Sequence, residues 1–156
     1  MKQTFDLTAL HDFIVRAKSA SYVGDGKPVA PCRTASHDLA YQEGAFAYLD
    51  SYFGGWDFIG EEVVYFDNLP VWAMNYYGRV LHPDRITAAQ AGQVIKASLS
   101  RMYKEGRFLG GCVHTHEGFR YEDTSQGEFA SFSGREWISS QGLMVYELLY
   151  HGGLIK

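Results

Sequence analysis

The fold is decided by residues 52–81, which read YFGGWDFIGEEVVYFDNLPVWAMNYYGRVL. This stretch contains two runs rich in Val, Tyr, Phe and Trp, at residues 61–66 and 71–77, separated by the sequence DNLP. β-Branched and aromatic residues favour strands, whereas Asp, Asn and Pro favour turns. The sequence therefore predicts a β-hairpin with a turn at residues 67–70.

The two faces of the predicted hairpin differ because successive side chains of a strand point to opposite faces. A four-residue turn would place Glu62 opposite Asn75. One face of the second strand would then belong to the core, with Trp72, Met74 and Tyr76. The other face would line a polar cleft, formed by Glu62, Asn75, Tyr77 and Arg79.

Helical periodicity is found at two places in the chain. Apolar residues at positions 7, 10, 13, 14 and 17 predict a helix over residues 7–19, which Asp6 or Thr8 can cap. A second apolar stripe follows the sequence TAAQ at 87–90, which fits a capping box. With Gly106 as its C-terminal cap, this stripe predicts a helix over residues 88–105.

Most of the remaining chain has the composition of strands separated by short turns. We predict strands over residues 45–53, 107–116, 119–124, 128–138 and 143–150. The separators after residue 116 are short and rich in Gly and Ser, which favours antiparallel hairpins. We recognise no internal repeat and no linker. We therefore expect a single globular α+β domain, residues 1–156, with a curved, mainly antiparallel sheet and two principal helices packed on one face.

The composition excludes several classes of protein. The chain has 156 residues, 46% of them hydrophobic, and can therefore form an ordered core. Its formal net charge of -4 argues against direct nucleic-acid binding, which needs a basic surface. The sequence contains no signal peptide and no run of about 18 apolar residues, so we expect no membrane association. Cys32 and Cys112 lie far apart, which favours reduced thiols and a cytoplasmic location.

His114 and His116 are the strongest candidates for metal ligands. An H-x-H motif on a strand points both imidazoles to the same face. A third ligand would have to come from Glu122, Glu147 or His151, and none of them completes a local metal motif. We therefore predict no bound metal and no other cofactor.

Two further groups bear on catalysis. Glu61, on the predicted core face, would have a raised pKa if buried and could act as a general acid or base. The alternative is an ion pair between Glu61 and an arginine such as Arg79 or Arg135. Cys112 follows two glycines in an apolar run, which is typical of a buried structural thiol. No nucleophile motif is present, so the sequence identifies no catalytic residue.

The chain also resembles a family of bacterial domains of unknown function. Five segments carry the resemblance: DSYFGGWDFIGEEVVY at 50–65, PVWAMNYYGRVL at 70–81, YKEGRFLGG at 103–111, SFSGREWI at 131–138 and YELLYHGGLIK at 146–156. Members of that family are sometimes fused behind a Cro-type helix-turn-helix in regulators of transcription. The resemblance implies a fold unit and a cytoplasmic setting, but no reaction. We expect no helix-turn-helix in this chain, because one helix alone precedes the resembling segments.

Three classes of function remain. Aromatic and amide side chains are plentiful, which favours a small-molecule-binding or sensor-like domain. Its ligand would lie against Glu62, Asn75, Tyr77 and Arg79, with the guanidinium holding a carboxylate or phosphate. An ion pair between Arg79 and Glu62 is the plain alternative for this face. The other two classes are a small enzyme that uses a carboxylate or a His-bound metal, and a protein-interaction domain. The sequence predicts no oligomeric state.

Overall fold

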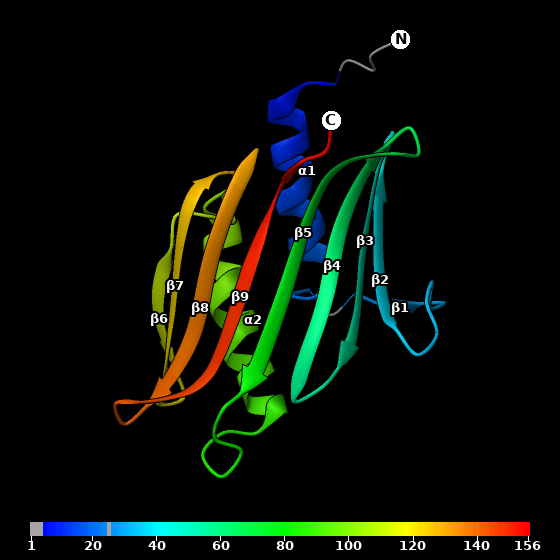
Figure 1. Cartoon of the computed structure of the whole chain (residues 1–156). Helices are drawn as coiled ribbons and strands as arrows, with labels where there is room; N and C mark the ends of the chain where they lie inside the picture. The colour runs from blue at the N-terminus through cyan, green and yellow to red at the C-terminus, as the bar shows by residue number, and fades with distance from the viewer. Residues whose placement is uncertain (1–4, 25) are drawn as a thin grey trace.

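In residues 5–24 and 26–156, which the computed structural model describes, the chain forms two helices and one nine-stranded sheet (Figure 1). The helices are α1 (Leu7–Ala20) and α2 (Ala88–Lys104). The strands are β1 (Pro28–Val29), β2 (His37–Glu43), β3 (Phe46–Gly54), β4 (Asp57–Phe66), β5 (Leu69–Val80), β6 (Cys112–His116), β7 (Phe119–Glu128), β8 (Ser131–Ser140) and β9 (Leu143–Leu154). Each helix is followed by a block of strands.

Both predicted helices are confirmed, together with their N-terminal caps. The side chain of Asp6 accepts a hydrogen bond of 3.1 Å from the N–H of Thr8 at the start of α1. At the start of α2, the Thr87 hydroxyl accepts from the Gln90 N–H, and the Gln90 side chain accepts from the Thr87 N–H. These contacts satisfy amides that have no partner within the helix, so each helix begins where its cap lies.

The hairpin of β4 and β5 is present, but its turn is shorter than predicted. Asp67 and Asn68 form a two-residue turn with φ angles of 47° and 66°. Positive φ at both central positions matches the right-handed twist of the flanking strands. A bulge opposite Val64 and Tyr65 then adds one residue, Val71, to β5. Turn and bulge together change the predicted pairing by one residue.

This change exchanges the two glutamates of β4. Glu62 lies opposite Met74, not opposite Asn75, and is only 6% exposed. Glu61 lies opposite Asn75 on the outer face. The predicted positions of Glu61 and Glu62 were wrong, because a slip of one residue moves every side chain to the other face. Trp72 is fully buried, which confirms the predicted core face of β5.

Strand bounds also differ from the prediction elsewhere. Residues 107–111 form a loop rather than a strand, since Gly106, Gly110 and Gly111 all have positive φ. The separator predicted at residues 124–127 belongs to β7, and the turn follows Glu128. The short strand β1 and the edge-proximal strand β2 were not predicted, because their largely exposed residues lack a continuous apolar alternation.

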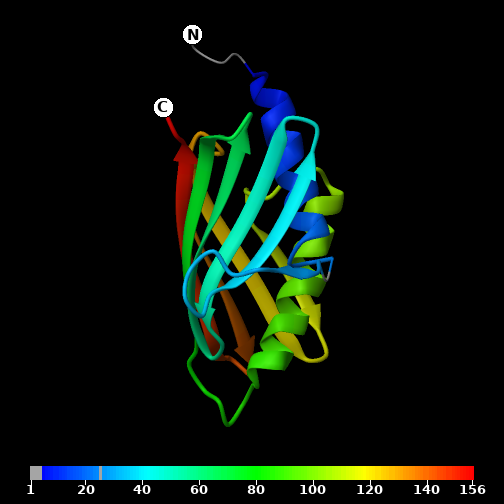
Figure 2. The same ribbon diagram turned by 90° about the vertical axis from the view of Figure 1, so that its right-hand side faces the viewer.

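The strand order is β1-β2-β3-β4-β5-β9-β8-β7-β6, and all neighbouring strands are antiparallel. The sheet is open, with β1 and β6 at its edges. It curves around α1 and α2, which both pack on the same face (Figure 2). The predicted α+β class with a curved antiparallel sheet is thus confirmed. In the described part of the chain, neither helix has the length and apolar character needed to cross a membrane.

The topology has an internal repeat, so the prediction of a chain without a repeat is wrong. One half of the fold consists of α1 and β2–β5, and the other of α2 and β6–β9. The last strands of the two halves, β5 and β9, pair at the centre of the sheet, where Tyr76 lies opposite Tyr150. The halves are therefore related by an approximate twofold axis between these two tyrosines.

Main-chain hydrogen bonds at the two ends of β5 and β9 follow the same symmetry. The N–H of Leu81 donates to the carbonyl of Val145 at 2.8 Å, and the N–H of Ile155 donates to that of Val71 at 2.9 Å. Equivalent residues of the strands lie about 74 positions apart in the sequence, and those of the helices, counted from their caps, lie 81 positions apart. Few of them are identical, which is why the repeat is not apparent from the sequence alone.

The core lies between the helices and the inner face of the sheet. Its largest fully buried side chains come from both halves and include Phe13, Tyr48, Trp72, Tyr121 and Tyr146. Tyrosine is therefore a core residue here, and its hydroxyl needs a partner inside the protein.

Candidate functional site

A cavity of about 260 Å³ lies between the helices and the inner face of the sheet. Both helices and six strands, β3–β5 and β7–β9, contribute to its lining. Typical small-molecule pockets measure about 300–1,000 Å³. The cavity therefore suits a ligand smaller than an average drug.

Four carboxylates from the inner face of the sheet line this cavity: Asp50, Glu62, Asp123 and Glu136. Each is at most 6% exposed. The register places the two carboxylates of each half on directly opposite residues of neighbouring strands. Burying ionised carboxylates is costly unless they are paired or hydrogen-bonded, so their partners decide whether the arrangement is stable.

Tyrosine hydroxyls supply most of these partners. Tyr76 donates to Asp50 at 2.6 Å, Tyr150 donates to Asp123 at 3.1 Å, Tyr48 donates to Glu62, and Tyr121 and Tyr146 both donate to Glu136. Burial raises the pKa of each of these tyrosines, so they remain protonated donors. The polar interior is therefore a network of tyrosine–carboxylate hydrogen bonds.

The internal repeat generates this network twice. The sequence Tyr-x-Asp occurs at 48–50 on β3 and again at 121–123 on β7. In each half the tyrosine of this motif donates to the glutamate of the next strand, and the last strand supplies the tyrosine that donates to the aspartate. Glu62 thus corresponds to Glu136, and Tyr76 corresponds to Tyr150.

Lys18 breaks the symmetry between the halves. Its Nζ lies 2.5 Å from Oε2 of Glu62, and the side chain is 5% exposed. The ammonium also faces the rings of Trp72 and Phe108, at 5.8 and 5.3 Å from their centroids. Among the described residues that line the cavity, Lys18 is the one basic side chain against four carboxylates. The cavity is therefore acidic.

Several polar groups of the lining have no hydrogen-bond partner in the described part of the chain, among them the hydroxyl of Tyr52. Tyr76 bonds only Oδ1 of Asp50, which leaves Oδ2 without a donor. The hydroxyl of Tyr103, on α2, likewise has none. Burial raises the pKa of Tyr103, and the charges of Glu62 and Glu136 add to the effect. Among the described residues, the buried side-chain polar atom without a partner is Oγ of Ser21, which is not part of the lining. Oδ2 of Asp50 and the Tyr103 hydroxyl are therefore accessible from the cavity and available to a ligand.

The cavity reaches the surface beside Gly54, Gly55 and Gly92, of which Gly54 and Gly55 are exposed. A Cβ at Gly92 would meet only the hydroxyl of Tyr22, at 3.5 Å. Counted from the N-terminal caps, the α1 residue equivalent to Gly92 is His11. The ring of His11 packs against the rings of Phe129 and Phe108, at 5.4 and 5.8 Å. Gly92 lines the cavity and has no side chain to cover it.

Burial also raises the pKa of the carboxylates. It raises the pKa of Asp50 to about 7, with a further contribution from the charge of Glu62, while the bond from Tyr76 opposes it. It raises the pKa of Asp123 to about 7 in the same way, with the charge of Glu136 adding to it. Burial raises the pKa of Glu136 too. These groups therefore bind protons more tightly in the folded chain than in the unfolded chain.

This difference predicts that the domain loses stability as the pH rises from about 4.5 to 7. Each carboxyl that binds an additional proton when folded lowers the free energy of unfolding by about 1.4 kcal/mol per pH unit across this window. Burial lowers the pKa of His114 and acts in the opposite direction, so the slope must be compared between variants. We expect the double variant Asp50→Asn, Asp123→Asn to show a flatter urea-unfolding profile than the wild type. Parallel profiles for the two proteins would contradict this expectation.

The residues predicted to bind a ligand do not form one site. Asn75, Tyr77 and Arg79 lie on the outer face of the sheet, whereas Glu62 lines the cavity on the inner face. Arg79 does not pair with Glu62; its guanidinium donates to Glu147 at 2.8 Å. Glu62 is therefore separated from the other three residues. Ligand binding by Asn75, Tyr77 and Arg79 on the outer face stays a prediction.

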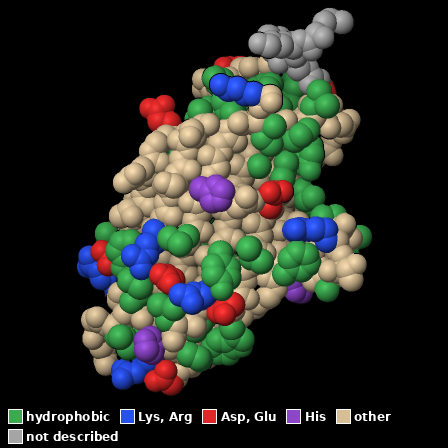
Figure 3. Space-filling model, in the orientation of Figure 1, with side chains coloured by type: hydrophobic (Ala, Val, Ile, Leu, Met, Phe, Trp, Pro, Cys, Tyr) green, Lys and Arg blue, Asp and Glu red, His purple; other side chains and the backbone are tan. Residues whose placement is uncertain are grey.

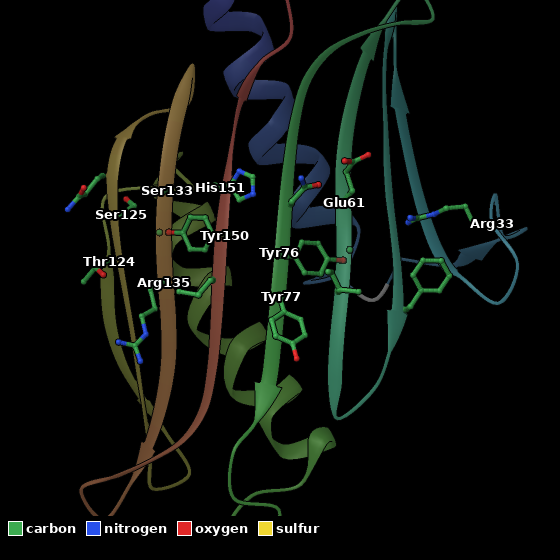
Figure 4. A pocket seen from close by; sticks show the side chains of 17 residues that line it. Arg33, Glu61, Tyr76, Tyr77, Thr124, Ser125, Ser133, Arg135, Tyr150 and His151 are labelled. Carbon is green, nitrogen blue, oxygen red and sulfur yellow. The ribbon is translucent and has the colours of Figure 1, made fainter.

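The outer face has a shallow depression of about 950 Å³ (Figure 4). Asn75 and Tyr77 line it, and Arg33 and Arg135 lie toward opposite edges of the sheet. Arg135 is already bonded to Glu147 at 3.0 Å. Over the lower half of this face, acidic and basic side chains are intermixed (Figure 3). A ligand here would remain largely hydrated, so we consider the inner cavity the stronger candidate.

An exposed apolar row crosses the same face. Ile59, Tyr77 and Leu149 are direct neighbours on β4, β5 and β9, and they are 55%, 44% and 56% exposed. Exposed apolar surface can serve as a contact for another protein. The protein-interaction alternative therefore remains a prediction for this face.

The two histidines of the H-x-H motif do lie on one face. Their rings stack with centroids 6.4 Å apart, and Nδ1 of His114 lies 3.2 Å from the hydroxyl of Ser98 on α2. Glu122 pairs with Val113 in the register and so lies on the other face. Among the described residues, no group of three His, Cys, Asp or Glu side chains is arranged to hold a metal. Cys32 and Cys112 are free thiols.

Sequence reasoning missed Lys18, Asp50, Tyr103, Asp123 and Glu136. They lie on five different elements and meet only because the topology brings the two halves together. The signal that could have found them is the recurrence of Tyr-x-Asp at 48–50 and 121–123, each followed by a glutamate in the next strand.

Fold and site define an α+β domain in which an open antiparallel sheet and two helices enclose an acidic, tyrosine-rich cavity. The chain belongs to the DUF5680 family, described as a domain of unknown function, whose model matches residues 50–155. The match begins at Asp50 and ends beyond Leu154, so it covers the four cavity carboxylates. Neither a curated protein nor a solved structure matches the chain.

Proposed function

We propose that this domain binds a small molecule in the cavity between the helices and the inner face of the sheet. The observation that carries the proposal is the presence of unpartnered polar groups in the lining of an acidic cavity, among them Oδ2 of Asp50 and the hydroxyl of Tyr103. A ligand that bonds both groups would complete the tyrosine–carboxylate network. Contact with both helices and the sheet would shield a bound ligand from part of the solvent, which strengthens each polar contact.

The setting that we propose is the cytoplasm of a bacterium, with the domain acting as a sensor-like module. The support is the resemblance to domains found in regulators of transcription, together with the two free thiols. We propose no direct contact with nucleic acid, since the chain carries a net charge of -4.

The test uses substitutions at Gly92, where the cavity opens. Gly92→Phe places a ring beside Tyr22 and should abolish ligand binding, whereas Gly92→Ala should preserve it. Alanine should also raise the free energy of unfolding by about 0.5–1 kcal/mol, because glycine is unfavourable within a helix. The measurement is an NMR screen of neutral, cationic and anionic fragments against ¹⁵N-labelled wild type and both variants.

We expect hits that shift amide signals of α2 and of β3–β9 in the wild type and in Gly92→Ala, but not in Gly92→Phe. Circular dichroism and the dispersion of the spectra would show that the variants are folded. Hits that bind all three proteins equally, or a screen without hits, would rule out the cavity as the binding site.

General acid–base catalysis is the second candidate function. Burial raises the pKa of both Asp50 and Asp123 to about 7, and a group that titrates near neutral pH is suited to proton transfer. The same screen separates the candidates, because a substrate changes its own NMR spectrum over time and a ligand does not.

A further inference from the structure

The internal repeat allows the two halves of the cavity to be compared residue by residue. Counted from the N-terminal caps Asp6 and Thr87, the buried positions of the helices coincide: Leu10, Phe13, Ile14 and Ala17 of α1 match Ala91, Val94, Ile95 and Ser98 of α2. On the same count, the α2 residue equivalent to Lys18 is Leu99. Leu99 also lines the cavity.

Among the residues that line the cavity, the two halves therefore differ at one charge. In the first half the ammonium of Lys18 contacts Glu62 at 2.5 Å. In the second half the equivalent glutamate, Glu136, receives only the hydroxyls of Tyr121 and Tyr146. An uncharged leucine occupies the position where the repeat has its lysine. The second half thus has two carboxylates, those of Asp123 and Glu136, but no lysine ammonium that corresponds to Lys18.

From this comparison we infer that the cavity ligand is a small organic cation, whose ammonium group occupies the second half beside Glu136 and Asp123 and replaces the missing lysine. This inference rests on the proposed function and specifies the chemistry of its ligand. Buried charges are normally paired, and a bound ammonium would pair these carboxylates as Lys18 pairs Glu62.

Independent features of the lining suit the same ligand class. Oδ2 of Asp50, in a side chain that is 4% exposed, can accept a hydrogen bond from the ligand. The Tyr103 hydroxyl can bond a polar atom of the ligand, and the rings of Tyr76 and Tyr150 offer faces for cation–π contact. The nearby guanidinium of Arg107 donates to the carbonyls of Leu109 and Gly111 and is not a contact of Asp123.

The charged and titratable groups around Glu136 leave room for a cationic ligand. From the sheet it is faced by Asp123 on β7 and by the hydroxyls of Tyr121 and Tyr146. The charge of Lys18, from α1, reaches Glu136 but contacts Glu62. From α2 the cavity receives Leu99 and Tyr103, which bring no charge at neutral pH. Burial raises the pKa of Glu136, and a bound cation would lower it again.

The inference is tested with three probes of similar shape and different charge: phenethylamine, 2-phenylethanol and phenylacetate. Dissociation constants are measured by NMR titration at pH 7.5. We expect the wild type to bind the amine at least tenfold more tightly than the alcohol and to reject the carboxylate. Glu136→Gln should weaken binding of the amine at least tenfold and leave binding of the alcohol within about twofold.

Leu99→Lys provides a complementary variant, because it places a lysine at the position of the inferred ammonium. It should abolish binding of phenethylamine, while the uncharged control Leu99→Met should retain it. Circular dichroism establishes that each variant is folded. If Leu99→Lys does not fold, Glu136→Gln alone still tests where the ammonium binds.

Other outcomes overturn the inference in distinguishable ways. Preference for the alcohol or the carboxylate, lost in Gly92→Phe, would refute a cationic ligand and leave the cavity as a binding site. Binding of the amine that is unchanged in Glu136→Gln would refute the placement of its ammonium. Absence of binding by all three probes would refute the inference, and the broader fragment screen would decide separately whether the cavity binds anything.

Discussion

Replacing Trp72 by alanine is expected to lower the free energy of unfolding by about 3–5 kcal/mol. Trp72 is fully buried, and its ring stacks on Phe132 at 5.9 Å and meets Phe108 edge-on at 5.7 Å. Its indole N–H donates to the carbonyl of Phe129 at 2.9 Å. The substitution leaves a large cavity at the junction of the two halves and removes the donor from a main-chain carbonyl.

Equilibrium unfolding in urea measures this loss. Tyr77→Ala is the matched control, since Tyr77 lies on the same strand but is 44% exposed, and it should cost less than about 1 kcal/mol. A loss below about 1 kcal/mol for Trp72→Ala would contradict the assignment of this face of β5 to the core.

Lys18→Met is expected to have an effect of similar size, about 3–5 kcal/mol at neutral pH. Methionine preserves the apolar stem of the side chain but leaves Glu62 without its cation among three further carboxylates. Breaking one partner of a buried ion pair is costly because the remaining charge is left uncompensated. The double variant Lys18→Met, Glu62→Gln should therefore recover most of the lost stability.

A double-mutant cycle in urea tests this coupling. Arg16→Met is the control on the same helix, because Arg16 pairs with Glu43 at the surface, with both side chains about half exposed. Such a surface pair contributes at most about 1 kcal/mol. Equal losses for Lys18→Met and Arg16→Met, or additive effects of the two substitutions in the cycle, would contradict the account of Lys18 as a buried counter-ion.

Most of the fold could be predicted from the sequence, since its signals are local. The capping box at Thr87 defines the start of α2, and the aromatic runs around Asp67 and Asn68 indicate the β4–β5 hairpin. The register could not be predicted, because the turn length and the bulge at Val71 together decide it. A change of one residue was enough to move Glu62 from the outer face to the inner face.

The candidate site was much less predictable. Asp50 and Asp123 each lie in a strand of aromatic or polar residues. From the local sequence, each aspartate would be expected at the surface. They face one another only after the two repeats assemble through β5 and β9. Lys18 lies in a helix that the apolar periodicity predicts. The burial of Lys18 depends on its ion pair with Glu62, and the predicted register places Glu62 on the wrong face of the sheet.

A crystal structure of the protein with its tightest-binding fragment would show directly whether the cavity is the binding site. We expect electron density between α2 and the inner face of the sheet, within hydrogen-bonding distance of the Tyr103 hydroxyl and of Asp50 or Glu136. Density on the outer face beside Asn75 and Tyr77, with the cavity holding only water, would contradict this expectation.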